Sequence, residues 1–446
     1  MSLPAARLAG GVLDVVDDRM DAIVVGAGPA GITGARELAA AGLSTVVLER
    51  GQFPGSKNVW GGILYRDPTE AIIPGFEAEA PLERPIIEQR YMLLSSDAAM
   101  TASYRSMRFA EEPYNAYTAF RGGFDQWYAS KAEEEGVEVY PEFTVTDLLW
   151  EDGAVVGATT GDAEGELYAN VVVLADGANS LLGQRAGLHE EWRPDEQALV
   201  AKETLRLDAT KIEERFNLPQ GKGTALEIFG ESTWGMLGYG FIYTNKDSLS
   251  IGTGALLSDL ITSGRNVNDM LDRFKAHQAI VPLIEGSESE EYSAHLIPEG
   301  GYNRLPRLYA DGVVMVGDAA GLVNPLNREG ANLAMVSGKF AAMAIIEATE
   351  REDFSATGLS RYWELLEESF VIKDLYKIRH MTDFAHDRPW LFGEYPEFIS
   401  EAARRYLTVS GQPKASVQKD ILKLFGSVPK KRLLSDAVGA LRAFKG

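Results

Sequence analysis

The sequence contains no cysteine among its 446 residues, and this absence excludes several kinds of chemistry. The chain can form no disulfide, offers no thiol nucleophile and lacks the thiolates that hold most iron–sulfur clusters. Histidine is scarce, and the five histidines show neither His-x-His nor His-x-x-x-His spacing: His189, His277, His295, His380 and His386. A metal site is therefore not expected.

Long apolar runs are also missing. The longest candidate, residues 340–346, continues directly into Glu347 and is far shorter than the roughly 18 residues that cross a bilayer. The N-terminal segment contains Asp14, Asp17 and Asp18 instead of a basic start followed by an apolar core, so it does not resemble a secretory signal. We expect residues 1–19 to form an N-terminal extension and the protein to stay in the cytoplasm.

Positive charge is scarce in most of the chain and concentrated at its end. The net charge is −22, but residues 402–446 contain ten Lys or Arg and only two acids, a net charge of +8. The rest of the chain therefore carries −30, which makes it a poor nucleic-acid binder.

The basic tail also has apolar residues at helical spacing. A basic cluster, residues 430–432, precedes six such residues: Leu433, Leu434, Ala437, Val438, Leu441 and Phe444. A basic amphipathic helix is typical of binding to a membrane surface or to a partner protein. The alternative is that this apolar face packs on the body of the same chain.

Residues 21–50 predict a β-α-β unit that binds a dinucleotide. Residues 22–25 and 45–48 are apolar runs typical of buried parallel strands, and residues 32–41 predict the helix between them. Gly26 permits the tight turn, Gly28 lets a pyrophosphate approach the backbone, and Gly31 permits close packing of helix on strand. Glu49 is placed to bind ribose hydroxyls and would repel a 2′-phosphate. This unit alone leaves FAD and NAD both open.

Two further apolar strands end in similar turns. Residues 170–175 lead into Asp176-Gly177, and residues 312–316 lead into Gly317-Asp318. Turns at the carboxyl edge of one parallel sheet surround one ligand. Asp318 is then placed to bind the hydroxyls of a ribityl chain, and a helix beginning near Gly330 directs its N-terminus at the flavin ring. This arrangement favours FAD.

Two segments near these turns are expected to contact the cofactor. Residues 53–62 are too glycine-rich for regular structure and follow the second strand, so backbone there can approach a flat ring. Arg121 precedes a helix expected over residues 125–135, with Asp125 in its first turn, and can reach a phosphate. An ordinary surface loop and a solvated arginine are the alternatives.

The fold class expected is α/β with antiparallel β: a Rossmann-like FAD-binding domain of the glutathione-reductase/hydroxylase type, an inserted antiparallel-sheet domain and a helical C-terminal region. Strand composition over residues 199–207, 224–229, 237–243 and 248–254 indicates the inserted sheet. We assign the domains as follows: FAD-binding, residues 20–80, 103–190 and 296–350; sheet, 81–102 and 191–295; helical, 351–446.

Several motifs resemble those of FAD-dependent oxidoreductases that include aromatic hydroxylases and geranylgeranyl reductases: GAGPAG, Arg121 before FDQW, LADGANS and VGDAAG. Longer strings are similar to FixC, the flavoprotein subunit of electron-transfer-flavoprotein–quinone oxidoreductases: GSKNVWGGILY, GFIYTNKDSLSIG, EYSAHLIPEGGYNRLP and PWLFGEYPEF. The resemblance extends from Asp21 to the C-terminus.

The resemblance implies a set of FAD-binding residues and no catalytic side chain. The set comprises Gly26, Ala27, Gly28, Pro29, Ala30, Gly31, Glu49, Arg50, Lys57, Asn58, Gly61, Gly62, Arg121, Val145, Asp176, Gly177, Gly317, Asp318, Gly330, Ala331 and Asn332. Residues 57–62 would lie beside the isoalloxazine ring. Residues 325–332 depart from the pattern of FixC relatives, so no contact is assigned to Leu326, Asn327 or Arg328.

The resemblance also implies redox partners. Electrons would arrive from an electron-transfer flavoprotein of α and β subunits and pass to a membrane quinone in the sheet domain. Because the chain has no cysteine, a separate ferredoxin-like subunit would carry iron–sulfur clusters, as in electron-bifurcating FixABCX complexes. The protein would associate peripherally with the cytoplasmic face of the cell membrane.

Two other functions remain open from the sequence. One is a flavoenzyme that transforms a substrate, resembling an aromatic hydroxylase or a geranylgeranyl reductase. The lack of a second complete GxGxxG weakens a dedicated NAD(P)H site but does not exclude this reading. The other is an FAD-bound scaffold that only assembles partners.

Overall fold

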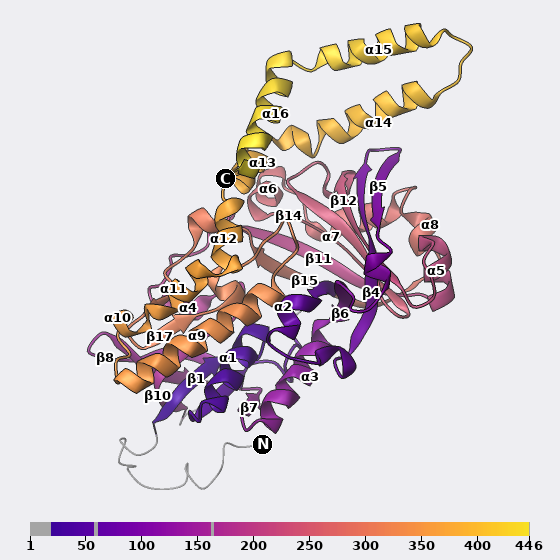
Figure 1. Ribbon diagram of the computed structural model, residues 1–446. Helices are drawn as coiled ribbons and strands as arrows, with labels where there is room; N and C mark the ends of the chain where they lie inside the picture. The colour runs from indigo at the N-terminus through magenta and orange to yellow at the C-terminus, as the bar shows by residue number, and fades with distance from the viewer. Residues whose placement is uncertain (1–18, 58–60, 162–164, 446) are drawn as a thin grey trace.

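The computed structural model describes residues 19–57, 61–161 and 165–445, which form two β-sheets, their covering helices and a helical C-terminal part (Figure 1). The first sheet has eight strands: β1 (Met20–Val25), β2 (Thr45–Glu49), β7 (Glu138–Pro141), β8 (Val145–Glu151), β9 (Ala154–Thr160), β10 (Glu166–Leu174), β16 (Tyr309–Ala310) and β17 (Val313–Met315). Its main path runs β16-β17-β10-β1-β2-β7.

The centre of this sheet is parallel and buried on both faces. β1 pairs in parallel with β10 and β2, so that Val24 lies between Val173 and Val47, all three buried. Such residues form strands because β-branched side chains pack well on a pleated surface, and helices cover both faces of parallel sheets. The strands that the sequence predicts at residues 22–25, 45–48 and 170–175 are thus confirmed.

The second sheet has nine strands and is mostly antiparallel: β3 (Gly61–Tyr65), β4 (Leu82–Leu94), β5 (Ala99–Arg105), β6 (Ala116–Phe120), β11 (Gln197–Arg206), β12 (Gly223–Gly230), β13 (Gly238–Thr244), β14 (Ser248–Leu256) and β15 (Glu288–Pro298). Its main path runs β15-β11-β14-β13-β12-β4-β6-β3. One central pair, β12 with β4, is parallel. The inserted sheet is therefore mixed at that pair, because β4 enters from a distant part of the chain.

This sheet also recruits strands from ranges that the sequence analysis placed elsewhere. β3 and β6 lie within the ranges assigned to FAD binding, β5 crosses the boundary after residue 102, and β15 crosses the boundary at residue 296. Hydrogen bonding connects them all to the nine-stranded sheet. We propose that the two domains follow the two sheets, with these four strands in the second.

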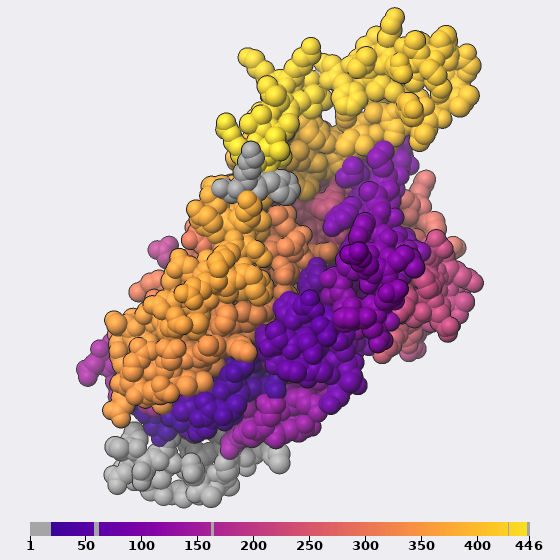
Figure 2. Space-filling view, viewed as in Figure 1, coloured from indigo at the N-terminus to yellow at the C-terminus, as the bar shows by residue number. Residues whose placement is uncertain are grey.

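Helices fill the remaining chain: α1 (Pro29–Ala40), α2 (Arg66–Glu70), α3 (Arg121–Glu134), α4 (Leu181–Arg185), α5 (Ala209–Phe216), α6 (Leu257–Ser263), α7 (Val267–Ala276), α8 (Val281–Ile284), α9 (Ala331–Arg351), α10 (Ala356–Leu359), α11 (Arg361–Glu368), α12 (Phe370–Lys377), α13 (Met381–His386), α14 (Glu394–Leu407), α15 (Lys414–Ser427) and α16 (Lys430–Lys445). α14 and α15 project from the body as a helical hairpin, and α16 returns toward it (Figures 1 and 2). The expected helical C-terminal region is confirmed.

Asp436 fixes the returning helix α16 to the base of the hairpin. Its buried carboxylate accepts hydrogen bonds from Arg388 Nε at 3.1 Å, from Trp390 Nε1 at 2.9 Å and from the Tyr395 hydroxyl. The guanidinium of Arg432 lies 4.2 Å from the Trp390 ring centroid. These contacts hold α16 while α14 and α15 extend outward.

α9 is long and apolar enough to cross a membrane, contrary to the sequence-based expectation that no segment approaches this length. However, 67% of its most apolar window is buried inside the protein. Its apolar character serves packing, because α9 crosses α1 beside the parallel sheet (Figure 1).

The crossing of α1 and α9 depends on two glycines. A Cβ on Gly338 would lie 2.1 Å from the carbonyl oxygen of Ala30, and a Cβ on Gly34 would lie 3.3 Å from the carbonyl oxygen of Gly338. The two backbones therefore approach at a distance that no side chain at Gly338 permits.

We predict that Gly338→Ala lowers the free energy of unfolding by about 2 kcal/mol, because the helices must separate to admit the methyl group. Urea denaturation measures this change. Gly426→Ala in α15, where the added Cβ meets nothing within 4 Å, is the matched control and should leave stability unchanged or slightly raised. Equal stability of the two variants would contradict the predicted close contact.

Candidate functional site

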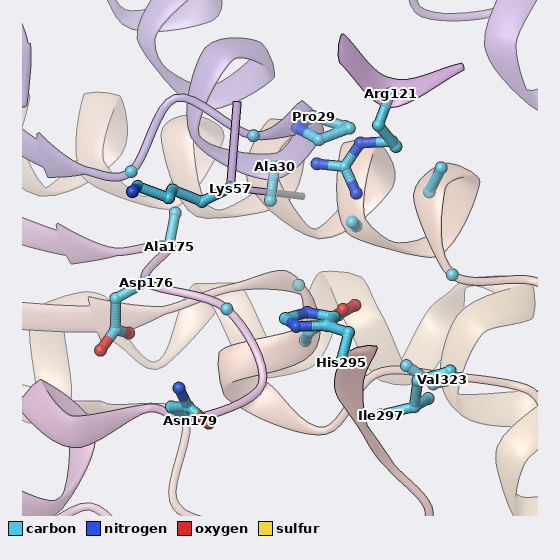
Figure 3. A pocket seen from close by; sticks show the side chains of 18 of the residues that line it. Pro29, Ala30, Lys57, Arg121, Ala175, Asp176, Asn179, His295, Ile297 and Val323 are labelled. Carbon is cyan, nitrogen blue, oxygen red and sulfur yellow. The ribbon is translucent and has the colours of Figure 1, made fainter. Parts of the chain in front are cut away.

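A cavity of about 500 Å³ lies between the carboxyl edge of the eight-stranded sheet and one face of the nine-stranded sheet. Figure 3 shows Pro29, Ala30 and Arg121 on one side of it, and His295 and Ile297 opposite them. Both sheets thus contribute to one site. Parallel sheets bind ligands at this edge because their strands end there together.

The turn after β1 brings backbone close to the cavity. Gly26 has φ +107°, and a Cβ there would lie 2.3 Å from the carbonyl oxygen of Ala175. Gly28 caps α1, which begins at Pro29 instead of at residue 32, and a Cβ on Gly28 would meet Arg121 Nη2 at 3.3 Å. The free N–H groups at the start of α1 therefore face a space bordered by a guanidinium, as an anion site requires.

Glu49 holds this turn in place from the end of β2. Its buried carboxylate accepts hydrogen bonds from the backbone N–H of Ala27 at 2.9 Å and of Gly51 at 2.7 Å. Each oxygen keeps a second lone pair, and the side chain lines the cavity. Glu49 therefore organises the glycine turn as well as presenting an acceptor to a ligand.

Arg121 and Asp125 form an ion pair at the cavity wall, and this corrects one expectation. α3 begins at Arg121 instead of at residue 125, so Asp125 lies in the second turn and does not cap the helix. It accepts hydrogen bonds from Arg121 Nε at 2.8 Å and Nη2 at 2.6 Å. Burial lowers the pKa of the Arg121 guanidinium, but the charge of Asp125 raises this pKa by more than burial lowers it. The guanidinium therefore stays charged.

The two turn aspartates border the cavity in strongly desolvated positions. Asp176 Oδ2 accepts a hydrogen bond from the backbone N–H of Leu182 at 3.2 Å, but Oδ1 is buried with no partner among the described residues. Burial raises the pKa of Asp176 to about 6. Burial also raises the pKa of Asp318, an effect that the charge of Arg121 opposes. An acceptor left unpaired at the cavity wall fits a ligand that brings hydroxyl or N–H donors.

The N-terminus of α9 reaches the other end of the cavity. Gly330 caps the helix, and both Gly330 and Ala331 line the cavity. The side chain of Asn332 turns away and donates a hydrogen bond to Glu329 Oε1 at 2.9 Å. Asn332 thus positions the helix start and does not line the cavity.

Most residues that the sequence analysis selected meet at this cavity: Gly26, Gly28, Pro29, Ala30, Glu49, Arg50, Lys57, Gly62, Arg121, Val145, Asp176, Gly177, Gly317, Asp318, Gly330 and Ala331. Three others are described but do not line it: Ala27, Gly31 and Asn332. Asn58 lies outside the described residues. Their assignment to FAD stays a prediction.

Gly61 and Gly62 belong to a strand and not to the irregular loop expected from their composition. In β3 they pair with Phe120 and Ala119 of β6. β3 is the edge strand of its sheet, where glycine is tolerated and leaves room for a ligand beside the backbone. Gly62 lines the cavity.

The sequence analysis missed the wall formed by the nine-stranded sheet and by Glu299, the residue that follows β15: Val200, Lys202, Tyr239, Phe241, Tyr243, Ser293, His295, Ile297 and Glu299. Burial lowers the pKa of Lys202 to about 8 and raises that of Glu299 to about 8. The alternation at residues 239, 241 and 243 and the lone Lys202 in an apolar strand were signals in the sequence.

Arg328 connects the segment before α9 to the second sheet. It donates a hydrogen bond to Gln89 Oε1 at 2.9 Å and forms an ion pair with buried Glu227 of β12. The Tyr65 hydroxyl donates to the carbonyl oxygen of Asn327 at 2.6 Å. These contacts hold the segment before α9 to three strands of the second sheet, β3, β4 and β12, and Arg328 itself lines the cavity.

Solved structures that share this fold include FAD-dependent halogenases. A geranylgeranyl bacteriochlorophyll reductase-like protein from Thermoplasma acidophilum superposes with a TM-score of 0.71 at 20% identity, covering 94% of this chain and 99% of that one. The myxobacterial FAD-dependent halogenase CndH superposes with a TM-score of 0.63 at 19% identity, covering 96% and 91%. The chain has the fold of FAD-dependent oxidoreductases.

Sequence relatives identify the family within this class. Residues 20–210 match the pyridine nucleotide-disulphide oxidoreductase family, and residues 381–445 match the ETF-QO/FixC family C-terminal domain. Protein FixC of Bradyrhizobium diazoefficiens is 48% identical, covering 92% of this chain and 95% of the relative. A probable electron transfer flavoprotein-quinone oxidoreductase of Escherichia coli, YdiS, is 39% identical, covering 95% and 98%. The chain belongs to the FixC family, and its cofactor is FAD.

We predict that Glu49→Gln weakens FAD binding about tenfold, because its amide group cannot accept from both backbone N–H groups and loses the charge that strengthens these bonds. A fluorescence titration of the FAD-depleted protein with FAD measures this affinity. Glu133→Gln on the exposed face of α3 is the control and should bind FAD normally. Unchanged FAD affinity in Glu49→Gln would show that Glu49 has no role in the cofactor site.

Proposed function

We propose that this protein is an electron-transfer subunit that takes electrons from an electron-transfer flavoprotein and delivers them to a quinone. The observation that carries this proposal is a cavity that residues of both sheets border together. One end has the backbone turns of a dinucleotide site, and the other has an aromatic wall suited to a second flat ring. Membership in the FixC family supports the same role.

The residues of the cavity fit FAD. The start of α1 and Arg121 would hold the diphosphate, and Glu49 would hold the adenosine ribose. Asp318 would accept hydrogen bonds from the ribityl chain, while Gly62, Lys57 and the N-terminus of α9 would border the ring. When bound, FAD supplies reversible acceptance of two electrons and their release to the next carrier.

The protein's own groups then orient the ring and exclude water. The α9 N-terminus places its positive dipole end at the cavity and favours added negative charge there. The aromatic residues Tyr239, Phe241 and Tyr243 form the opposite wall, with ring centroids of the last two 4.9 Å apart. A quinone seated on this wall would share the cavity with the cofactor.

The partners follow from this assignment. We assign the electron donor to an electron-transfer flavoprotein of α and β subunits, in agreement with the name of the relative YdiS. The chain has no cysteine, so iron–sulfur clusters in such a complex would belong to a separate ferredoxin-like subunit. We further propose that the complex is of the electron-bifurcating FixABCX type.

The redox test compares possible electron donors for the FAD-loaded protein. We expect the flavin absorbance to bleach with NADH plus an electron-transfer flavoprotein, but not with NADH or NADPH alone. A soluble benzoquinone added next should restore the absorbance. Stopped-flow spectroscopy measures both steps, and the protein depleted of FAD is the control.

Two outcomes would contradict the proposed function. Rapid bleaching by NADPH alone, with oxygen consumed when a phenol is added, would indicate a hydroxylase. A flavin that neither donor reduces would indicate a scaffold that binds FAD without electron transfer.

We also propose that the α14–α15 hairpin attaches the protein peripherally to the cytoplasmic face of the cell membrane. Large apolar side chains are exposed near its tip, with Leu407 73% and Val409 87% exposed. Leu422, Leu434 and Leu441 are also exposed, and the surrounding segment carries the net charge of +8. Exposed apolar groups beside cations fit an anionic lipid surface.

We predict that the double substitution Leu407→Glu with Val409→Glu reduces binding to vesicles containing phosphatidylglycerol at least tenfold, because it removes buried apolar area and adds two negative charges. Vesicle co-sedimentation at low salt measures the binding. Trp150→Glu, an exposed apolar position on β8, is the matched control and should bind as the wild type does. A wild-type protein that ignores these vesicles would overturn the membrane proposal and leave the redox proposal standing.

A further inference from the structure

Lys202 is a buried lysine that forms no ion pair with the part of the chain that the structure describes, although the charge of Glu291 on β15 raises its pKa and partly opposes the effect of burial. It lies in β11, is 4% exposed and lines the cavity. Among the described residues its ammonium forms no ion pair or hydrogen bond, and its neighbour is the Phe120 ring, whose centroid lies 5.3 Å from Nζ. A buried ammonium is costly unless an acceptor pairs with it, so the position calls for a ligand oxygen.

On the opposite face of β11, by contrast, a lysine is paired with a carboxylate of the same chain. Glu203, the next residue, points to that face, where its carboxylate accepts hydrogen bonds from Lys275 Nζ at 2.9 Å. The lysine on that face therefore has its partner within the chain. Only the cavity face of β11 presents a lysine that the described residues leave unpaired.

A second unpaired polar atom lies directly beside Lys202. Ser293 of β15 is the register partner of Lys202, and its Oγ is buried with no hydrogen-bond partner among the described residues. Ser293 also lines the cavity. Side chains of paired residues lie on the same face of a sheet, so one oxygen can meet both donors.

The sheet surface on the other side of Lys202 is flat and apolar. Lys202 pairs with Gly252 of β14, which in turn pairs with Phe241 of β13. A Cβ on Gly252 would lie 2.3 Å from Phe241 Cζ, so the phenyl ring covers the glycine. The ring also stacks on Tyr243. A planar ligand can rest on this surface with its edge toward Lys202 and Ser293.

We propose that Lys202 and Ser293 bind a ring oxygen of the electron acceptor, a flat quinoid molecule seated over Phe241 and Gly252. The ammonium donates to a carbonyl oxygen and binds more tightly when that oxygen carries negative charge. The identity of the ligand as an electron acceptor rests on the proposed function. The binding geometry rests only on the two unpaired groups and the flat surface beside them.

The test measures equilibrium binding to the FAD-loaded, oxidised protein by calorimetry. The probes are 2-hydroxy-1,4-naphthoquinone, which is anionic at neutral pH, and uncharged 1,4-naphthoquinone. Lys202→Met should weaken the anionic probe about tenfold or more and the neutral probe about threefold or less, because only the former loses an ionic bond. Ser293→Ala should weaken both probes about threefold, the value of one neutral hydrogen bond.

Two matched variants accompany these measurements. Lys202→Arg keeps the positive charge and should keep the preference for the anionic probe. Lys211→Met removes an exposed lysine of α5 and should change neither affinity. The flavin absorption spectrum and reduction potential of Lys211→Met, measured without probe, should equal those of the wild type.

Each contrary result has a distinct meaning. Equal affinities in Lys202→Met and the wild type, or no binding of either probe by the wild type, would overturn the proposed subsite. Weakening of both probes by the same factor in Lys202→Met would mean that the lysine acts only through the structure of the wall, and would also overturn the subsite. Wild-type protein that binds both probes but is never reoxidised by quinone would refute the proposed function while leaving the subsite intact.

Discussion

The close approach of backbone to backbone around the glycine turn after β1 is the constraint on which the rest of the structure depends. Gly26 lies against the carbonyl of Ala175, and a Cβ on Gly31 would lie 2.1 Å from the carbonyl oxygen of Gly26. Gly338 of α9 approaches Ala30 in the same layer. These contacts set the start of α1 at the edge of the sheet. The same glycines therefore permit the close packing of helix on sheet and position the phosphate site.

Buried charged groups along the cavity wall are the second feature that determines which ligand the cavity can bind. Although most of the chain is strongly acidic, cationic groups border the cavity: Arg50, Lys57, Arg121, Arg185, Lys202 and Arg328. Arg121 and Arg328 are paired with carboxylates inside the protein, which keeps them charged despite burial. Asp176 and Glu299 form no ion pair with any described residue, and burial raises the pKa of each. The site therefore favours a ligand that brings both negative charge and hydrogen-bond donors.

Much of the FAD-binding half could be predicted from the sequence because its determinants are local. Glycine spacing, apolar runs and the acid at residue 49 are contiguous features, and they identified β1, α1, β2 and the turn at Asp176. Helix starts were less predictable: α3 begins at Arg121 because the ion pair with Asp125 stabilises its first turns, a contact that composition does not reveal. Likewise, Gly61 and Gly62 form a strand only because β6 offers them a partner.

The second wall could not be predicted because it depends on pairing between distant strands. Lys202, Phe241 and Ser293 lie far apart in the chain, and only the order β15-β11-β14-β13 brings them into one row on one face. Gly252 pairs with both Lys202 and Phe241, and nothing in the sequence distinguishes it from other glycines. Its missing side chain lets the phenyl ring of Phe241 lie toward the Lys202 ammonium. The two halves of the cavity thus differ in kind. A local motif builds the cofactor cradle shared across a large class of folds, whereas long-range register builds the wall where the identity of the acceptor is decided.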